Sequence, residues 1–280
     1  MQNCQCCVDE SAVPRTGPNL KVIGTMSVGY DHIDLAACKK RNIAVGYTPG
    51  VLTDATAELA VALLLATSRR LIEGASAVKS GQWGSWSPLW MCGPGLLNST
   101  VGIVGLGRIG LAIARRLRPF NVSRVLYTGR QPKDSAKEVS AEFVGLDTLL
   151  AESDFVVVSC AITPETTALF DRKRFAQMKR GAMFVNISRG AVVVQEDLVD
   201  ALKNGVIRAA GLDVCTPEPL PVDSPLLALP SCVVLPHIGS AAEETRAVMS
   251  VMTAKNILAA FNNQPMPAQV KSPCLLNTSY

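Results

Sequence analysis

The chain has 280 residues, of which 48% are hydrophobic and 18% are charged, and its formal net charge is +4. That length corresponds to about two domains, and the apolar share excludes a disordered chain, because such chains lack the apolar surface that offsets chain entropy. The net charge is too small to indicate a nucleic-acid partner, which would require a clustered basic surface.

The amino-terminal part is predicted to form one βαβ unit followed by a long helix. The unit consists of a strand at 19–25, a helix at 35–40 and a strand at 43–45. An apolar helix follows at 55–70, and Thr53 or Asp54 is expected to be its N-cap.

From about residue 100, short apolar strands alternate with helices. Strands are predicted at 100–105, 124–128, 155–160, 182–187, 209–214 and 232–235. Helices are predicted at 111–120, 146–151 with Asp147 as a cap, 172–178, 195–203 and 244–261. Apolar strands separated by helices predict an α/β fold with a doubly wound parallel sheet, covered by helices on both faces.

Cysteine usage and hydropathy restrict the cellular setting. The chain has 9 cysteines, but only Cys4, Cys6 and Cys7 cluster, and C-x-C-C is not a zinc spacing, so no metal is predicted. Reduced thiols in a cytoplasmic protein are therefore the preferred interpretation. The longest apolar run, near residues 57–67, is well short of the roughly 20 residues that cross a bilayer, and residues 1–10 are not typical of a signal sequence.

A glycine motif predicts a dinucleotide site. Residues 105–110 read G-x-G-x-x-G, directly after a predicted strand and at the start of a predicted helix. The first glycine permits the tight turn, the second lets a pyrophosphate approach the backbone, and the third lets helix and strand pack closely. The amino terminus of the helix then binds the phosphates, as in a Rossmann-type NAD(P)-binding domain.

The end of the next strand favours NADP(H) over NAD(H). An NAD enzyme usually places an acidic residue there for the ribose hydroxyls, but this chain has no carboxylate before Asp134. Arg130 is instead in position to pair with a 2′-phosphate. The alternative is that Arg130 and Lys133 are solvated loop charges.

Three polar side chains of complementary chemistry follow three predicted strands. His237 is suited to donate a proton because histidine is the side chain that ordinarily exchanges protons near neutral pH, and a carboxylate such as Glu218 would orient its ring. Arg189 can hold a substrate carboxylate through two hydrogen bonds. These strand ends should meet at one edge of the sheet, whereas His32 precedes a helix and is expected to be structural.

These motifs together resemble the D-isomer-specific 2-hydroxyacid dehydrogenases. The resemblance rests on VGIVGLGRIG, NISRG, GLDVCTPEP and LPHIGS, and it extends over residues 19–270. TMSVGYDHID, GQWGSWSPLW and YTGRQP look most like the glyoxylate reductase/hydroxypyruvate reductase branch. The resemblance implies NADPH-dependent reduction of small 2-keto acids (glyoxylate, hydroxypyruvate) to glycolate and D-glycerate by hydride transfer, usually in a homodimer.

The resemblance also implies roles for individual residues. The implied catalytic residues are Arg189, Glu218 and His237, and the implied substrate-binding residues are Ser27, Val28, Gly29, Arg189 and Trp86, the last acting at a partner subunit's site. The expected cofactor-binding residues are Gly105, Gly107, Arg108, Ile109, Gly110, Gly129, Arg130, Gln131, Pro132, Ala161, Ile187, Arg189, Asp213, His237, Gly239 and Ser240.

The domain organisation implied by the family is a cofactor domain inserted in a substrate domain. The cofactor domain is expected at 51–241, and residues 1–50 with 242–280 are expected to form an incomplete, flavodoxin-like substrate domain. Family members normally carry several strand–helix units before the stretch that begins at Asn19. The alternatives are therefore a truncated form that binds cofactor without turnover, or a non-enzymatic dinucleotide-binding protein similar to the dehydrogenase-like corepressors.

Overall fold

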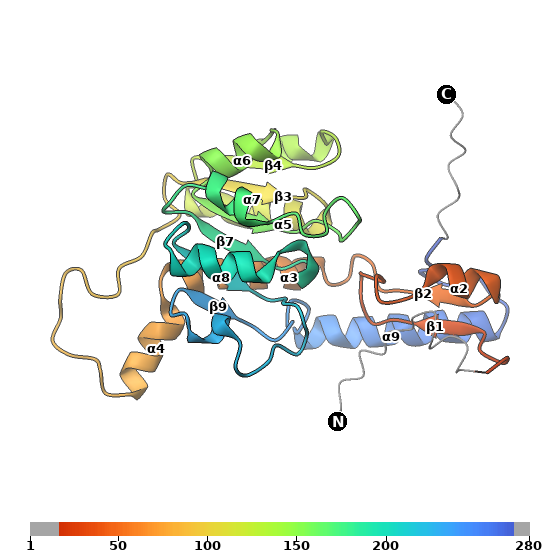
Figure 1. The fold of residues 1–280 in the computed structure, drawn as a ribbon. Helices are drawn as coiled ribbons and strands as arrows, with labels where there is room; N and C mark the ends of the chain where they lie inside the picture. The colour runs from red at the N-terminus through yellow and green to blue at the C-terminus, as the bar shows by residue number, and fades with distance from the viewer. Residues whose placement is uncertain (1–16, 272–280) are drawn as a thin grey trace. The chain divides into compact units, whose positions relative to one another are not determined.

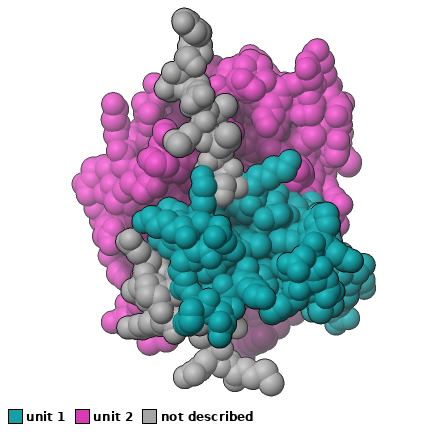
Figure 2. Space-filling view, turned by 90° about the vertical axis from the view of Figure 1, so that its right-hand side faces the viewer, with its two compact units in different colours: residues 1–52, 240–280 teal, residues 53–239 magenta. Residues whose placement is uncertain are grey.

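The computed structural model describes residues 17–271 and contains two compact units (Figure 2). Residues 53–239 form one, here called the sheet unit, and residues 1–52 with 240–280 form the other, here called the flanking unit. The cysteine cluster at residues 4–7 lies outside the described residues. All five cysteines in the described part of the chain (Cys38, Cys92, Cys160, Cys215 and Cys232) are free thiols.

The sheet unit is built on a seven-stranded parallel sheet (Figure 1). Its strands are β3 (Thr100–Val104), β4 (Arg124–Thr128), β5 (Ala141–Phe143), β6 (Phe155–Val158), β7 (Met183–Asn186), β8 (Ala209–Leu212) and β9 (Cys232–Val234). Their order is β5-β4-β3-β6-β7-β8-β9, so the chain reverses its direction of winding between β3 and β6. This confirms the predicted doubly wound sheet.

Helices cover both faces of that sheet because its central strands are apolar on both sides. One face packs on α3 (Thr53–Ser68) and α5 (Arg108–Leu117). The other packs on α6 (Leu146–Glu152), α7 (Arg172–Gln177) and α8 (Gln195–Lys203). Short 3-10 turns complete the unit: η1 (Arg118–Phe120), η2 (Asp134–Val139), η3 (Gly190–Val192) and η4 (Pro225–Ala228).

Three details of the helix predictions were wrong. The helix expected at 111–120 begins at Arg108, directly after the glycine turn, and ends in a 3-10 turn that contains Pro119. Gly145, not Asp147, occupies the N-cap of α6, and Asp147 lies in the first turn, where it pairs with Arg174. Helix α3 begins at Thr53, so neither proposed cap residue precedes it.

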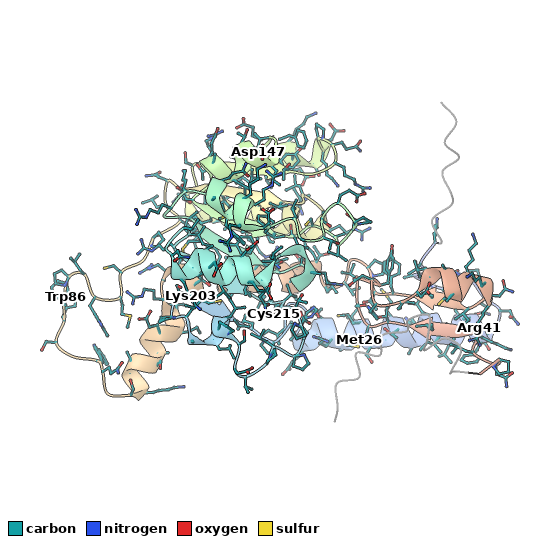
Figure 3. The ribbon with its side chains drawn as sticks, in the orientation of Figure 1. Met26, Arg41, Trp86, Asp147, Lys203 and Cys215 are labelled. Atoms are coloured by element: carbon teal, nitrogen blue, oxygen red, sulfur yellow. The ribbon has the colours of Figure 1, made fainter. Side chains whose placement is uncertain are left out.

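Helix α4 (Leu71–Lys79) and the loop that follows it extend away from the sheet (Figure 1), and they were not predicted. Arg70 separates α3 from α4 by adopting the left-handed region, with φ of 52°. The segment 71–90 exposes apolar side chains, and Trp86 near its far end (Figure 3) is 86% exposed.

The flanking unit contains β1 (Val22–Gly24), α2 (Leu35–Lys40), β2 (Ala44–Gly46) and α9 (Glu243–Phe261). The two strands pair in parallel, as expected for the βαβ unit. Asn256 of α9 is fully buried, and its side chain donates to the Tyr47 carbonyl (3.0 Å) and accepts from the Ala268 amide (2.9 Å). This amide therefore joins the end of β2 to the segment after α9. Within residues 17–271, no helix combines the length and the apolar character needed to cross a bilayer.

Candidate active site

The parallel sheet brings the residues that follow its strands to one edge, because the carboxyl ends of parallel strands lie together. Most of the predicted site residues follow such strand ends. They are Gly105, Gly107, Arg108, Ile109 and Gly110 after β3; Gly129, Arg130, Gln131 and Pro132 after β4; Ala161 after β6; Ile187 and Arg189 after β7; Asp213 and Glu218 after β8; and His237 and Gly239 after β9.

The turn between β3 and α5 requires glycine at two positions. Gly105 has φ of 98°, and a Cβ there would lie 2.8 Å from the backbone of Cys160. A Cβ at Gly110 would lie 2.2 Å from the Gly105 carbonyl oxygen. Gly107 differs, because a Cβ there would meet no other atom within 4 Å. It is the N-cap of α5 and supplies no side-chain cap, so the space beside the first amides of α5 fits an anionic pyrophosphate.

The loop after β4 presents a positive side chain at the same edge. Arg130 lies in the exposed stretch 129–134, which follows Thr128. The Thr128 carbonyl accepts a hydrogen bond from the Gly105 amide (3.0 Å), so this loop starts beside the glycine turn. The loop that starts beside the glycine turn therefore carries a guanidinium and, over residues 128–133, no acidic side chain.

Glu218 and His237 form a close pair at the ends of β8 and β9. The Nδ1 atom of His237 is 2.8 Å from Oε2 of Glu218, and the Cys215 amide donates to Oε1 at 3.0 Å. Burial raises the pKa of the Glu218 carboxyl, but the hydrogen bonds from His237 and Cys215, with the charges of His237 and Arg189, together lower it below its ordinary value. Glu218 is therefore ionised near neutral pH and can only accept, so Nδ1 carries a proton and Nε2 is the nitrogen available for exchange.

Asp213 holds the backbone of the segment that carries His237. Its side chain is buried (1% exposed) and accepts from the amides of Ile238 and Gly239, both at 2.8 Å, while its carbonyl accepts from the His237 amide at 2.9 Å. Burial raises the pKa of Asp213, although the two amides oppose this effect. His237 itself has φ of 53°, a left-handed conformation that these hydrogen bonds maintain.

Asn186 holds the backbone of the turn that carries Arg189. This fully buried amide ends β7, and its Oδ1 accepts from the amide (3.0 Å) and the hydroxyl (2.9 Å) of Ser188. Its Nδ2 donates to the Arg189 carbonyl at 2.9 Å. The turn that carries the guanidinium is therefore closed by a side chain. This role of Asn186 was not predicted from the sequence, although Asn and Ser after a strand are typical of such turns.

The remaining predicted residues lie elsewhere in the chain. Ser27, Val28, Gly29 and Ser240 belong to the flanking unit. There, the Ser27 hydroxyl contacts that of Thr25 at 2.7 Å, and the same Thr25 hydroxyl lies 3.3 Å from Nε2 of His32. Trp86 belongs to the sheet unit, in the extended loop after α4 (Figure 3). Within residues 17–271, no group of three or more His, Cys, Asp or Glu side chains is arranged to hold a metal ion.

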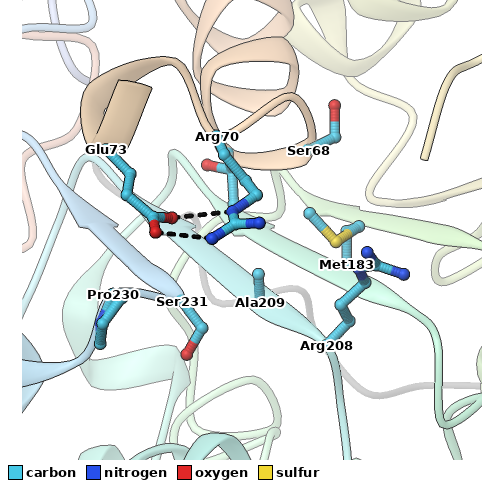
Figure 4. A pocket seen from close by; sticks show the side chains of 9 residues that line it. Ser68, Arg70, Glu73, Met183, Arg208, Ala209, Pro230 and Ser231 are labelled. Carbon is cyan, nitrogen blue, oxygen red and sulfur yellow. Dashed lines mark hydrogen bonds and ion pairs between the residues drawn. The ribbon is translucent and has the colours of Figure 1, made fainter. Parts of the chain in front are cut away.

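A cavity of about 230 Å³ lies at the amino ends of the strands, opposite the carboxyl ends that carry the candidate residues (Figure 4). Its lining includes Met183 and Ala209, the first residues of β7 and β8, together with an Arg70–Glu73 ion pair. The catalytic candidates follow the carboxyl ends of the strands, so this cavity is separate from them.

Comparisons with known proteins agree on one family. The family model for the NAD binding domain of D-isomer specific 2-hydroxyacid dehydrogenases matches residues 61–239. Proteins named glyoxylate reductase/hydroxypyruvate reductase from Mus musculus and Homo sapiens are 62% and 59% identical over 265 residues, covering 94% of this chain and 81% of each relative. The chain is also similar to the solved NADPH-dependent glyoxylate/hydroxypyruvate reductase from Sinorhizobium meliloti in complex with NADP and malonate, with a TM-score of 0.83 and 34% identity over 93% of this chain and 80% of that one.

The Asp213 hydrogen bonds predict a measurable effect on stability. Asp213→Asn retains one acceptor oxygen but turns an amide NH₂ toward the second backbone donor. Relief of the buried charge offsets part of this loss, so we expect the free energy of unfolding to fall by about 1 kcal/mol, the lower end of the cost of an unsatisfied buried donor. Urea denaturation of Asp213→Asn beside Asp223→Asn, at an exposed position, measures the difference. Equal midpoints for the two variants would contradict this assignment.

Proposed function

Because the chain belongs to the D-isomer-specific 2-hydroxyacid dehydrogenase family, we propose that it reduces glyoxylate and hydroxypyruvate to glycolate and D-glycerate with NADPH. The observation that carries the proposal is the Glu218–His237 pair, held at 2.8 Å on the edge of the sheet that also bears the dinucleotide motif. The similarity to reductases extends over 94% of the chain. It therefore does not favour the inactive or corepressor-like alternatives.

The cofactor is held by residues that follow β3, β4 and β6–β9. The amides at the start of α5 bind the pyrophosphate, and Arg130 binds the 2′-phosphate, which favours NADP(H) over NAD(H). Ala161, Ile187, Asp213, Gly239 and Ser240 complete the proposed contacts. The reduced nicotinamide, when bound, supplies a hydride to the substrate.

His237 supplies the proton that completes the reduction. The carbonyl carbon of the keto acid gains the hydride, and its oxygen takes a proton from Nε2 of His237. Glu218 stabilises the charged imidazole before this transfer and keeps the ring oriented through Nδ1. The products are the 2-hydroxy acid, the oxidised nicotinamide cofactor and a neutral imidazole, which regains its proton from solvent.

Arg189 binds the substrate carboxylate and polarises the carbonyl group. A guanidinium offers two parallel donors that match a carboxylate, and Asn186 and Ser188 fix the turn from which it extends. The backbone amides of Ser27, Val28 and Gly29 are proposed as further carboxylate donors. They belong to the flanking unit.

The active form is proposed to be a homodimer in the cytoplasm. Support for the dimer comes from the segment 71–90, whose exposed apolar side chains include Leu71, Ile72, Trp83, Trp86 and Leu89. Exposed apolar patches of this kind mark protein interaction sites. Trp86 of one copy would narrow the substrate site of the other. The odd number of cysteines, most of them placed singly along the sequence, supports a reducing compartment.

The role of His237 predicts a large kinetic effect. His237→Ala should lower kcat for glyoxylate roughly 10²–10⁴-fold, the range for loss of a general acid, while NADPH binding persists. His32→Ala is the matched control, because it removes the other histidine of the chain. Steady-state assays on folded samples of both variants measure the two values of kcat. Equal losses of kcat would show that the proton donor has been assigned wrongly.

The role of Arg130 predicts a change in cofactor preference. Arg130→Asp should weaken NADPH binding by about 1.5–3 kcal/mol, the range for hydrogen bonds to charged groups, with little effect on NADH. Lys203→Asp is the control, because it makes the same change of charge at the last residue of α8, away from the carboxyl ends of the strands. Fluorescence titrations with both cofactors test this, and a wild-type chain that binds NADH as tightly as NADPH would refute the assignment.

The proposed dimer predicts a dependence on the segment 71–90. Sedimentation equilibrium should give about twice the chain mass of 29.7 kDa. Trp86→Ser combined with Leu89→Ser should shift the equilibrium toward monomer, because it removes apolar area from the interface. Val222→Ser, at a position that is 95% exposed outside this segment, should leave it unchanged. A wild-type chain that remains monomeric at micromolar concentration would exclude the dimer.

A further inference from the structure

Tyr127 is a buried aromatic residue near the end of β4. It is 2% exposed and belongs to the core under α5, and its ring lies 5.3 Å from that of Phe143. A phenylalanine at position 127 would fill the same space in the core. A buried phenol needs a hydrogen-bond partner, so the presence of the hydroxyl requires an explanation.

The hydroxyl of Tyr127 accepts a hydrogen bond from the backbone amide of Lys133, with a distance of 2.8 Å. The two residues are six positions apart, and the chain between them is the loop that bears Arg130. At the other end of the loop, the Thr128 carbonyl accepts from the Gly105 amide at 3.0 Å. Both ends of this loop, residues 128–133, are therefore tied to the sheet unit by hydrogen bonds.

The hydrogen bond at the Lys133 amide matters because the side chains of this loop bury almost no apolar surface that could hold it in place. Residues 129–133 are all exposed, and only the core beneath η2 follows, at Ala136 and Val139. The Lys133 carbonyl accepts from the Ala136 amide at 3.1 Å, so η2 begins directly after the tie. A loop held in its binding conformation before the ligand arrives avoids an ordering cost on binding.

We propose that Tyr127 is a positioning residue for cofactor selection: its hydroxyl fixes residues 128–133 so that Arg130 meets the 2′-phosphate of NADP(H). This inference rests on the cofactor preference proposed above. The adenosine and pyrophosphate groups are held by the glycine turn and α5, so loss of the hydroxyl should weaken only the contact made through Arg130. The expected signature is a change in selectivity.

The test uses two fragments that differ by the 2′-phosphate. Calorimetric titration of the full chain with adenosine 2′,5′-bisphosphate and with adenosine 5′-monophosphate (AMP) compares them without turnover. Tyr127→Phe should raise the Kd of the bisphosphate roughly three- to tenfold, the effect of one lost hydrogen bond, and change that of AMP less than about twofold. Hydrogen–deuterium exchange of the Lys133 amide should become faster in the same variant.

Two controls separate positioning from packing. Phe143→Leu alters the ring contact but leaves the hydroxyl, so it should leave the ratio of the two Kd values unchanged. In an Arg130→Ala background, Tyr127→Phe should have no further effect on the bisphosphate, because the group that it positions is already absent.

The outcomes distinguish this inference from the proposal on which it rests. If the wild-type chain discriminates between the fragments and Tyr127→Phe discriminates equally well, the positioning role is wrong and the NADP(H) preference stands. A Tyr127→Phe effect that persists in the Arg130→Ala background would also overturn the inference. If the wild-type chain binds both fragments equally, the cofactor preference itself fails and this inference fails with it.

Discussion

The parallel pairing of β3 with both β4 and β6 determines where chemistry can occur in this molecule. Because the chain winds away from β3 in both directions, the connections from β3 and β6 lead to opposite faces of the sheet. The turn after β3 therefore lies where no crossover helix covers it. Gly105 and Gly110 let that turn close tightly, and the uncapped amides of α5 become available to an anion.

Buried polar side chains at the strand ends hold the loops of the site. Tyr127 is the second-to-last residue of β4, Asn186 is the last of β7 and Asp213 directly follows β8; each is at least 98% buried. Each binds backbone groups of a loop that carries a functional candidate: Arg130, Arg189 or His237. The cost of burying these groups is offset by backbone hydrogen bonds, and the rigid sheet thereby sets the conformation of exposed loops.

The pair of carboxylates after β8 shows how environment separates two similar groups. Asp213 is desolvated, which raises its pKa, and it serves the backbone of the His237 segment. Burial also raises the pKa of Glu218, but hydrogen bonds from His237 and Cys215, with the charges of His237 and Arg189, outweigh it and lower the pKa below its ordinary value. Asp213 and Glu218 carry the same functional group. Their different roles, holding the backbone and orienting the His237 ring, therefore follow from the hydrogen-bond donors that each carboxyl meets.

The sequence by itself determined the fold class, the dinucleotide turn and the identity of the polar residues after each strand. These features are local: apolar runs of strand length, glycines at fixed spacing and the first polar residues after an apolar run are all visible in a linear pattern. Even so, α4, β5 and the exact start of α5 were missed or misplaced, because short exposed elements and helix starts depend on packing as well as periodicity.

Only the tertiary structure decided how those residues act together. The 2.8 Å contact between Glu218 and His237 joins two different strand ends, and the ties from Asp213 to the His237 segment depend on the pairing of β8 with β9. In the sequence, Tyr127 looks like any other aromatic residue of a buried strand. The role of its hydroxyl is not visible there, because its hydrogen-bond partner is a backbone amide. The backbone partner of such a hydrogen bond leaves no trace in residue type, so the sequence could name the reacting groups but could not show which side chains hold them in place.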